Sequence, residues 1–468
     1  MPERFEQYIQ EVCRQVRWKR ARPGLADELR THLLDQKDAC LAEGMEEEAA
    51  EAESVRQMGD PVEVGTRLDR VHRPKPQWDL MILIGVLLAA GLALQGTVFE
   101  ELWDQEVCMD SGLAVIRIRA AILFGVLFML LVYWLDYTAL GLHSFLYCGL
   151  GLGIYLLSWR VSPQINYRVV YPCYLSLLWP IFLALLLYGL RGKGWKGLFF
   201  GLAGVGLSVG LNLSAPFFAG AGLAFFIGII LLLISVWKGW MGVPKKKASL
   251  VIAAFAAVPI LAVLFSCITS GYAKTRLFEA FHPEQDPLGR GYTAMGVRTL
   301  LQNAGWLEAG TEVDLAEQLL PEAQTDFMLT WVIYRLGWWA GLALIGLLVL
   351  LLALACHRAV RQRGMLGSLL STAAVLTLGG EVALYVMADL GFLLLDPIAL
   401  PFLSYGRCYM VLNLFLAGLM MSVFREERLP QREKGIYQAS PRRKWMISRQ
   451  EEGIIITIPL PSEGVGNR

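Results

Sequence analysis

The 468-residue chain is 55% hydrophobic and only 18% charged, and several of its apolar runs exceed the ~20 residues needed to cross a bilayer core. This composition excludes a chain that is soluble throughout, gives no sign of a nucleic-acid partner, and predicts a polytopic membrane protein. The net charge of +1 hides an asymmetry, because residues 1–75 hold 16 acidic and 13 basic side chains whereas the rest is mostly apolar.

The first 75 residues are predicted to form a small cytosolic bundle of about four helices. Phe5, Ile9 and Val12 recur at helical spacing, and no apolar segment typical of a signal peptide precedes them. Residues 20–71 resemble the short helical prefix found ahead of many bacterial membrane permeases. That resemblance brings no catalytic residue with it, and the segment is interpreted as a solvated folding or partner-docking module.

Ten membrane-spanning helices are predicted from Trp78 onward. They cover roughly residues 79–99, 118–138, 142–158, 171–190, 197–213, 217–237, 248–268, 327–355, 367–390 and 406–424. The expected fold class is therefore all-α, with a membrane domain over 76–428 and a cytosolic tail over 429–468. The tail is predicted to be mostly disordered, with one short strand.

Basic clusters predict the orientation of these spans. Lys and Arg gather at 191–197, 238–247, 357–364 and 425–434, all on the side that the N-terminus shares. Cytoplasmic loops carry an excess of Lys and Arg, so both termini are predicted to be cytoplasmic.

A segment of nearly sixty residues, 269–326, is predicted to lie on the opposite side as a large external loop. Long ordered loops in a compact fold tend to carry function. The stretch "YTAMGVRTLLQNAGWLEAG" within it has the spacing of an amphipathic helix, which is expected to lie in the interface plane.

Several motifs follow one another in and after this loop. They are Arg276, then "P-x-x-D-P-x-G-x-G-Y" at 283–292, "LPEAQTDF" at 320–327 and "LPFLSYG" at 400–406. This order resembles the SEDS family, whose members include RodA, FtsW and SpoVE. The resemblance covers nearly the whole membrane region, with ten spans of the same topology.

The resemblance implies a function. Family members are peptidoglycan glycosyltransferases of the GT-C-like type, which polymerise lipid II at the outer face of the bacterial cytoplasmic membrane during division, elongation or sporulation. The implied partners are lipid II, an undecaprenyl-linked glycan and a class B penicillin-binding protein acting as transpeptidase. The family's catalytic aspartate, in "TDF", falls on Asp326.

The chemistry of the reaction agrees with that assignment. Extending a glycan needs a base for the acceptor hydroxyl, which a carboxylate at the membrane surface can supply. The leaving pyrophosphate needs a divalent cation, Mg²⁺ or Mn²⁺, or basic side chains nearby. The candidate substrate-binding residues are Arg276, Arg290, Arg298, Ser404, Arg407 and Glu381. The alternative for Asp326, or for Thr325, is an ordinary helix cap at the start of the eighth span.

Departures from the family pattern leave other functions open. The Glu and Lys of the family's "QPSEFAK"-like segment are absent near Pro172, and the acid of "PDLG" is absent near Pro216. "EELG" becomes "YRLG" at 334–337, and "SYGGS" becomes "SYGRC" at 404–408. A transporter or flippase of lipid-linked precursors and a non-catalytic scaffold therefore remain as alternatives. Glu381, in the middle of the ninth span, is equally consistent with a cavity-lining role and with a protonated structural role.

Overall fold

The structure is a computed structural model. It describes the chain except for residues 1, 20, 75, 103–110, 166–167, 290, 308–318, 320–325, 394, 396–397, 405, 427–445, 451–452 and 458–468. The chain divides into two compact units, Met1–Leu429 and Pro430–Arg468, and each is described by itself.

The N-terminal region contains four helices. These are α1 (Glu3–Gln15), α2 (Arg22–Ala42), α3 (Glu47–Met58) and α4 (Pro61–His72). Their apolar faces share one cluster, in which Phe5, Val12 and Leu33 are fully buried. The helical spacing that predicted the bundle thus corresponds to the faces that pack together.

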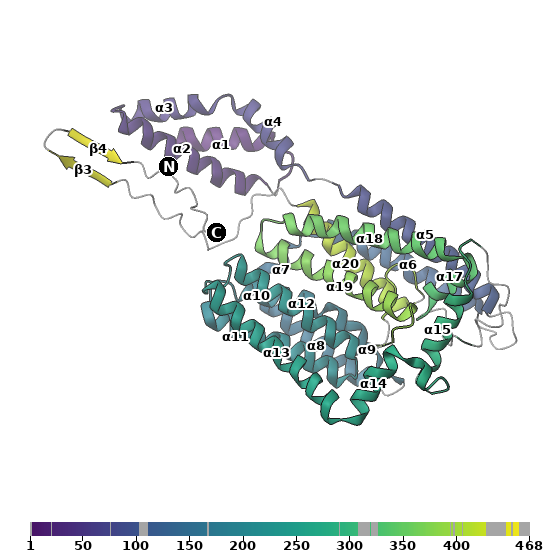
Figure 1. Ribbon diagram of the computed structural model, residues 1–468. Coiled ribbons are helices and arrows are strands. Elements are labelled where there is room, and N and C mark those ends of the chain that lie inside the picture. Colours follow the sequence, from purple (N-terminus) through teal and green to yellow (C-terminus); the bar gives the residue numbers. More distant parts are fainter. Residues whose placement is uncertain are drawn as a thin grey trace. The chain divides into compact units, whose positions relative to one another are not determined.

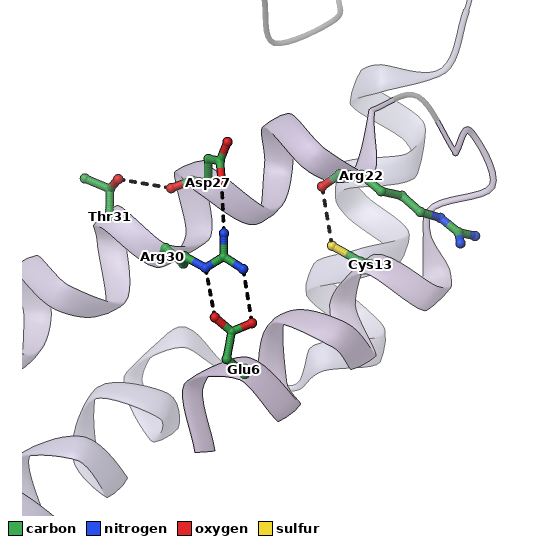
Figure 2. Close-up of polar contacts among 6 residues, drawn as sticks. All are labelled: Glu6, Cys13, Arg22, Asp27, Arg30 and Thr31. Carbon is green, nitrogen blue, oxygen red and sulfur yellow. Dashed lines mark hydrogen bonds and ion pairs between the residues drawn. The ribbon is translucent and has the colours of Figure 1, made fainter. Parts of the chain in front are cut away.

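An ion pair joins the first two helices. Arg30 of α2 donates from Nε and Nη2 to the two carboxylate oxygens of Glu6 in α1, at 2.9 and 3.1 Å, while its Nη1 donates to Asp27 (Figure 2). Such a two-point contact fixes the angle between the two groups as well as their distance.

The domain boundaries predicted at residues 75 and 428 stay predictions.

Ten helical segments of the described chain are long and apolar enough to cross a membrane, which confirms the all-α, ten-span fold class (Figure 1). They are α5 (Trp78–Leu102), α6 (Ser111–Trp134), α8 (Ser144–Val161), α9 (Val170–Leu175) with η1 (Ser176–Leu178) and α10 (Trp179–Gly189), α11 (Gly194–Ser214), α12 (Phe218–Trp237), α13 (Lys245–Thr269), α18 (Trp338–Arg361), α19 (Met365–Asp389) and α20 (Arg407–Arg425). Shorter elements join them: α7 (Thr138–Leu142), the strands β1 (Gln164–Ile165) and β2 (Arg168–Val169), α14 (Gly271–Phe281), η2 (Pro283–Gln285), α15 (Tyr292–Asn303) and α17 (Met328–Leu336).

Helix α19 lies at the centre of the bundle, where it packs against α10, α12, α17, α18 and α20 (Figure 1). Its buried positions run along its whole length and include polar residues at 377, 381 and 389. A helix that is buried on all sides takes its polar groups into the core, so each of them needs a partner inside the protein.

The eighth span differs from its predicted limits. The sequence predicted one helix over 327–355, but the chain breaks at Gly337 into α17 and α18, and the membrane-length segment is Trp338–Arg361. Gly337 has φ of 90°, a conformation that side chains other than glycine rarely adopt, and an added Cβ would meet the carbonyl oxygen of Trp306 at 2.6 Å. Apolar periodicity alone does not reveal such a break.

The long segment before α17 is helical where it is described. Helix α15 confirms the predicted amphipathic stretch, although it packs through Val297 and Leu300 against Phe327 and Trp331, at the start of α17. It therefore forms part of the protein core at this end of the bundle. Residues 308–318 and 320–325, which include all of "LPEAQT", lie outside the described residues.

The basic clusters at 191–197, 238–247 and 357–364 meet at one end of the bundle, together with Arg425 at the end of α20, whereas residues 427–434 of the fourth cluster lie outside the described residues. Gly192 and Gly194 donate backbone hydrogen bonds to Trp240 and Met241, at 2.9 and 3.0 Å. Lys238 donates to Ser368 at the start of α19. The end of α20 contacts the end of α6 through a hydrogen bond from Ser422 to the Leu135 carbonyl, and Arg358 contacts Asp79 at the start of α5.

The second unit contains an antiparallel hairpin of β3 (Met446–Gln450) and β4 (Gly453–Thr457). The sequence predicted one short strand here, and the structure has a pair. The disorder predicted for the remainder of the tail falls on residues outside the described part of the chain.

Candidate functional site

Asp326 lies in a turn directly before α17, and it is half-buried. The next residue, Phe327, is the N-cap of α17 and makes no side-chain capping hydrogen bond. Because α17 packs against α15 and α19, the carboxylate is positioned by three helices at the end of the bundle opposite the basic clusters.

Side chains of α19 bind the N-H groups that open α17. The Met328 N-H donates to the hydroxyl oxygen of Tyr385 at 2.9 Å, and the Thr330 N-H donates to Asp389 Oδ1 at 2.6 Å. The first N-H groups of a helix lack partners within the helix, and here a neighbouring helix supplies them. This arrangement reduces the need for Asp326 to act as a cap.

Asp389 is a further acidic residue at this end of the bundle, and sequence reasoning did not select it. Its side chain is fully buried, and Oδ1 accepts a second hydrogen bond from the Thr330 hydroxyl at 2.8 Å. Its Oδ2 is buried and has no hydrogen-bond partner among the residues that the structure describes. Asp326 lies near enough to Asp389, Tyr385 and Tyr409 for electrostatic interaction with all three. The signal that could have revealed Asp389 is a carboxylate that ends an apolar span.

Arg298 of α15 lies at the same end of the bundle. Its Nη2 donates to the carbonyl oxygens of Phe281 and Gly391, both at 3.3 Å, and Nη1 lies 3.7 Å from Glu284 Oε2. The pKa of Glu284 lies below its ordinary value because its own backbone N-H and His282 donate hydrogen bonds to the carboxylate, with a smaller contribution from Arg298. Arg298 therefore holds α15 against the segment that follows α19, two residues beyond Asp389.

Ser404 has a structural contact within its own turn. It is buried, its hydroxyl oxygen accepts a hydrogen bond from the Leu400 N-H at 3.0 Å, and it lies 3.3 Å from the Leu400 carbonyl oxygen. Gln95 of α5 donates to the Leu403 carbonyl at 2.7 Å. The "LPFLSYG" segment is thus fixed against the first span rather than open to solvent at Ser404.

Arg407 begins α20 and is exposed at a groove of about 600 Å³ between α6, α8, α9 and α20. Tyr171, Tyr174 and Leu412 also line the groove, whose walls are mostly apolar. The ring of Tyr174 packs edge-on against Tyr409, at 4.7 Å between centroids. Tyr409 lies near enough to Asp326 for electrostatic interaction, so this aromatic pair connects the groove with the end of the bundle that holds the carboxylate.

Glu381 is fully buried in the middle of α19. Its Oε2 accepts a hydrogen bond from Asn413 of α20 at 2.9 Å, whereas Oε1 has no hydrogen-bond partner in the described part of the chain. The structure thus places Glu381 in a contact between two central helices.

For two of the predicted substrate-binding residues, the structure does not describe the side chain. Arg276 lies on α14, but its side chain is outside the described part, and Arg290 is outside it altogether. Among the described residues, no group of three or more His, Cys, Asp or Glu side chains is arranged to hold a metal ion. The scattered cysteines likewise include no disulfide in this part of the chain.

Curated relatives match part of this chain. A protein of Trichlorobacter lovleyi named probable peptidoglycan glycosyltransferase FtsW is 26% identical over 162 residues, which are 34% of this chain and 42% of the relative. The peptidoglycan glycosyltransferase MrdB of Escherichia coli K12 is 28% identical over 187 residues, 39% of this chain and 48% of the relative. The chain thus spans less than half the length of these relatives.

The fold is also similar to solved structures. A chain from a peptidoglycan synthase complex, described as coordinating polymerization and crosslinking, superposes with a TM-score of 0.61 at 21% identity and covers 75% of this chain and 98% of that one. At this identity the similarity concerns the fold alone. Residues 177–429, more than half of the chain, match the cell cycle protein family FtsW/RodA/SpoVE. Together with the ten apolar helices, this match shows that the protein is a multi-pass membrane protein that belongs to the FtsW/RodA/SpoVE family of SEDS proteins.

Proposed function

We propose that the protein is a peptidoglycan glycosyltransferase that polymerises lipid II, with Asp326 as its general base. The observation that carries this proposal is the position of Asp326: a half-buried carboxylate at one end of the bundle, before a helix whose N-H groups are bound by Tyr385 and Asp389. The names of the FtsW and MrdB relatives support the same activity.

In the proposed reaction, Asp326 accepts the proton of an acceptor sugar hydroxyl as its oxygen attacks the anomeric carbon of the donor. The new glycosidic C-O bond forms while the C-O bond to the lipid pyrophosphate breaks, and the pyrophosphate leaves with the bonding electrons. Buried, rigid contacts hold the base in position before the reaction, so no conformational entropy has to be lost at the moment of reaction. The contacts of α17 with Tyr385 and Asp389 provide such a support.

The groove at Arg407 suits a lipid-linked pyrophosphate. Its walls are apolar and its volume of about 600 Å³ is that of a small-molecule site, while the guanidinium of Arg407 offers positive charge at one end. We place the lipid chain along α20 in this groove and the pyrophosphate near Arg407. Arg276 and Arg290 remain proposed contributors to the same charge, and Arg298 is proposed to position α15.

A divalent cation, Mg²⁺ or Mn²⁺, belongs to the proposal as a neutraliser of the leaving pyrophosphate. Magnesium is commonly held by one or two carboxylates together with substrate phosphates, so the absence of a three-residue cluster among the described side chains is compatible with it. Asp326 would hold the ion together with Asp389, whose Oδ2 has no hydrogen-bond partner among the described residues. No step above depends on the ion.

The proposed partners are a class B penicillin-binding protein as transpeptidase and an undecaprenyl-linked glycan as product, in division, elongation or sporulation. The solved synthase complex supports a partner of this kind through its similar fold. We further propose that both termini and the basic end face the cytoplasm, because the gathered Lys and Arg clusters follow the positive-inside rule.

The test is glycan synthesis from labelled lipid II by the purified full chain, with a partner transpeptidase and Mg²⁺ present. In Asp326→Asn, the side chain keeps its size but loses its ability to accept a proton, so product is expected to fall by ~10² or more at an unchanged melting temperature. Glu322→Gln is the control for a carboxylate four positions earlier in the sequence and is expected to keep near-normal turnover.

Two outcomes would count against the proposal. Full activity in Asp326→Asn would refute its role as the base. No glycan from the unmutated chain would favour the non-catalytic scaffold, or the flippase if lipid-linked precursor instead crosses the membrane of proteoliposomes. The "YRLG" and "SYGRC" departures would then be the first segments to exchange.

A further inference from the structure

Two basic loops are joined at the end of the bundle opposite Asp326. The loop between α10 and α11 donates backbone hydrogen bonds from Gly192 and Gly194 to the loop between α12 and α13. This pairing brings the basic side chains of both loops to one place. They are Arg191, Lys193, Lys196, Lys238 and Lys245–Lys247.

Carboxylates do not balance this charge. Residues 137–278 contain no Asp and no Glu, and in the described structure neither Lys193 nor Lys196 has an ion pair. Two neighbouring cations are held by hydrogen bonds within the protein: Arg191 donates to the Tyr188 carbonyl at 3.0 Å, and Lys238 donates to Ser368 at 3.0 Å.

Lys193 and Lys196 stand at the mouth of a groove of about 760 Å³ between α8, α10 and α11. Apart from the two lysines its lining is apolar, and the Lys193 Nζ lies 4.7 Å from the centre of the Phe145 ring. Small residues create the hollow, since Ala203 and Gly204 form part of its lining. A Cβ at Gly204 would lie 2.5 Å from Leu186 Cδ2.

The length of the groove matches one leaflet of a membrane. Its lining residues on α11 run from Lys196 to Leu207, a rise of about 16 Å along a helix. This distance is about half of the ~30 Å hydrocarbon core. An acyl chain that enters from the basic end would therefore lie along the groove to the middle of the bilayer.

We propose that this groove binds an anionic membrane phospholipid, with one acyl chain along α11 and the phosphate between Lys193 and Lys196. The charge of the site favours an anionic lipid over a zwitterionic one, because a zwitterionic headgroup carries its own cation and brings no net charge to the lysines. Basic pockets between membrane helices bind anionic headgroups through the same complementarity. The site is separate from Asp326 and does not depend on the proposed enzyme activity.

Native mass spectrometry of the full chain in detergent tests the proposal. Phosphatidylglycerol and phosphatidylcholine with identical acyl chains are added separately, and the adducts that survive activation are compared. The unmutated chain is expected to retain phosphatidylglycerol in clear preference. Each lysine near an anionic headgroup contributes a factor of about five, so Lys193→Gln with Lys196→Gln is expected to lower the affinity for phosphatidylglycerol about 25-fold.

Matched variants distinguish the groove from general surface charge. Lys246→Gln with Lys247→Gln removes two exposed charges at the same end that do not line the groove, and it is expected to leave retention unchanged. Ala203→Trp fills the groove from an exposed position and is expected to lower retention of both lipids at an unchanged melting temperature. Equal retention of both lipids by the unmutated chain, or an equal loss in the Lys246/Lys247 control, would overturn the proposal.

Discussion

Asp389 and Thr330 form a buried polar contact between α19 and α17. The Asp389 carboxylate accepts both the N-H and the hydroxyl of Thr330, at 2.6 and 2.8 Å, and both residues are fully buried. A buried polar group without a hydrogen-bond partner destabilises the fold by the full free energy of its removal from water. The pair is therefore expected to stabilise the start of α17 strongly. The position of Asp326 depends on that same start.

Thr330→Val tests the contact, because it keeps the shape of the side chain and removes only the donor. The change is expected to lower the free energy of unfolding by about 1–3 kcal/mol, since Asp389 loses one of its two hydrogen bonds in a buried site. Glycan synthesis at a temperature where the variant stays folded is expected to fall as well, because Asp326 becomes less firmly positioned. Thermal unfolding and product yield provide the two measurements.

Thr377→Val is the matched control for that variant. Thr377 is equally buried in α19, but its hydroxyl only donates back to the Ala373 carbonyl at 2.8 Å. Its loss is expected to cost less than the loss at Thr330 and to leave product yield unchanged. Equal effects at the two positions would contradict a specific role for the Thr330–Asp389 contact.

Apolar run length predicted the helices of the membrane domain well, because a span must contain about 20 apolar residues whatever its neighbours are. It did not predict breaks inside a run. The break at Gly337 follows from the left-handed backbone and the approach of Trp306, and neither is visible in local apolar spacing. The same limit applies to the supports of Asp326, since Thr330 and Asp389 are 59 residues apart and no local pattern joins them.

The contact between α1 and α2 predicts a pH dependence of the N-terminal bundle. The pKa of Glu6 lies below its ordinary value of 4.5 because Arg30 donates hydrogen bonds to its carboxylate. A group with a lowered folded pKa contributes stability above its unfolded pKa and loses it as the pH falls through the folded value. The bundle is therefore expected to lose stability below about pH 4.5.

Circular dichroism of a fragment of residues 1–75 measures this effect. The fragment is expected to be helical at neutral pH, and Glu6→Gln is expected to be less stable there but less sensitive to acid, so that the two melting temperatures converge at low pH. Glu11→Gln changes an exposed carboxylate on the same helix and is expected to follow the unmutated fragment. A fragment without helical signal would contradict an independently folding domain.

Across the whole molecule, charge divides the two ends of the bundle. The basic clusters of the described chain gather at one end, where backbone hydrogen bonds join the loops at 192–194 and 240–241 and Lys238 contacts Ser368. Asp326, Asp389 and the start of α20 lie at the other end. This division was predictable from sequence, because the basic clusters follow the fourth, sixth, eighth and tenth predicted spans. All even-numbered spans end on the same side of the membrane. The backbone hydrogen bonds between the two loops were not predictable from sequence, because they join residues about 47 positions apart.

If the basic end faces the cytoplasm, the two ends must differ in their access to a membrane-impermeant thiol reagent. In a background whose native cysteines are replaced by serine, Leu288→Cys lies at a position that is 91% exposed, between η2 and α15. It is expected to react in intact cells. Lys246→Cys, exposed at the basic end, is expected to react only after the membrane is opened. Reaction at position 246 in intact cells, with no reaction at position 288, would show the opposite orientation. Asp326 would then lie on the cytoplasmic side, where it would not face an acceptor glycan outside the cell.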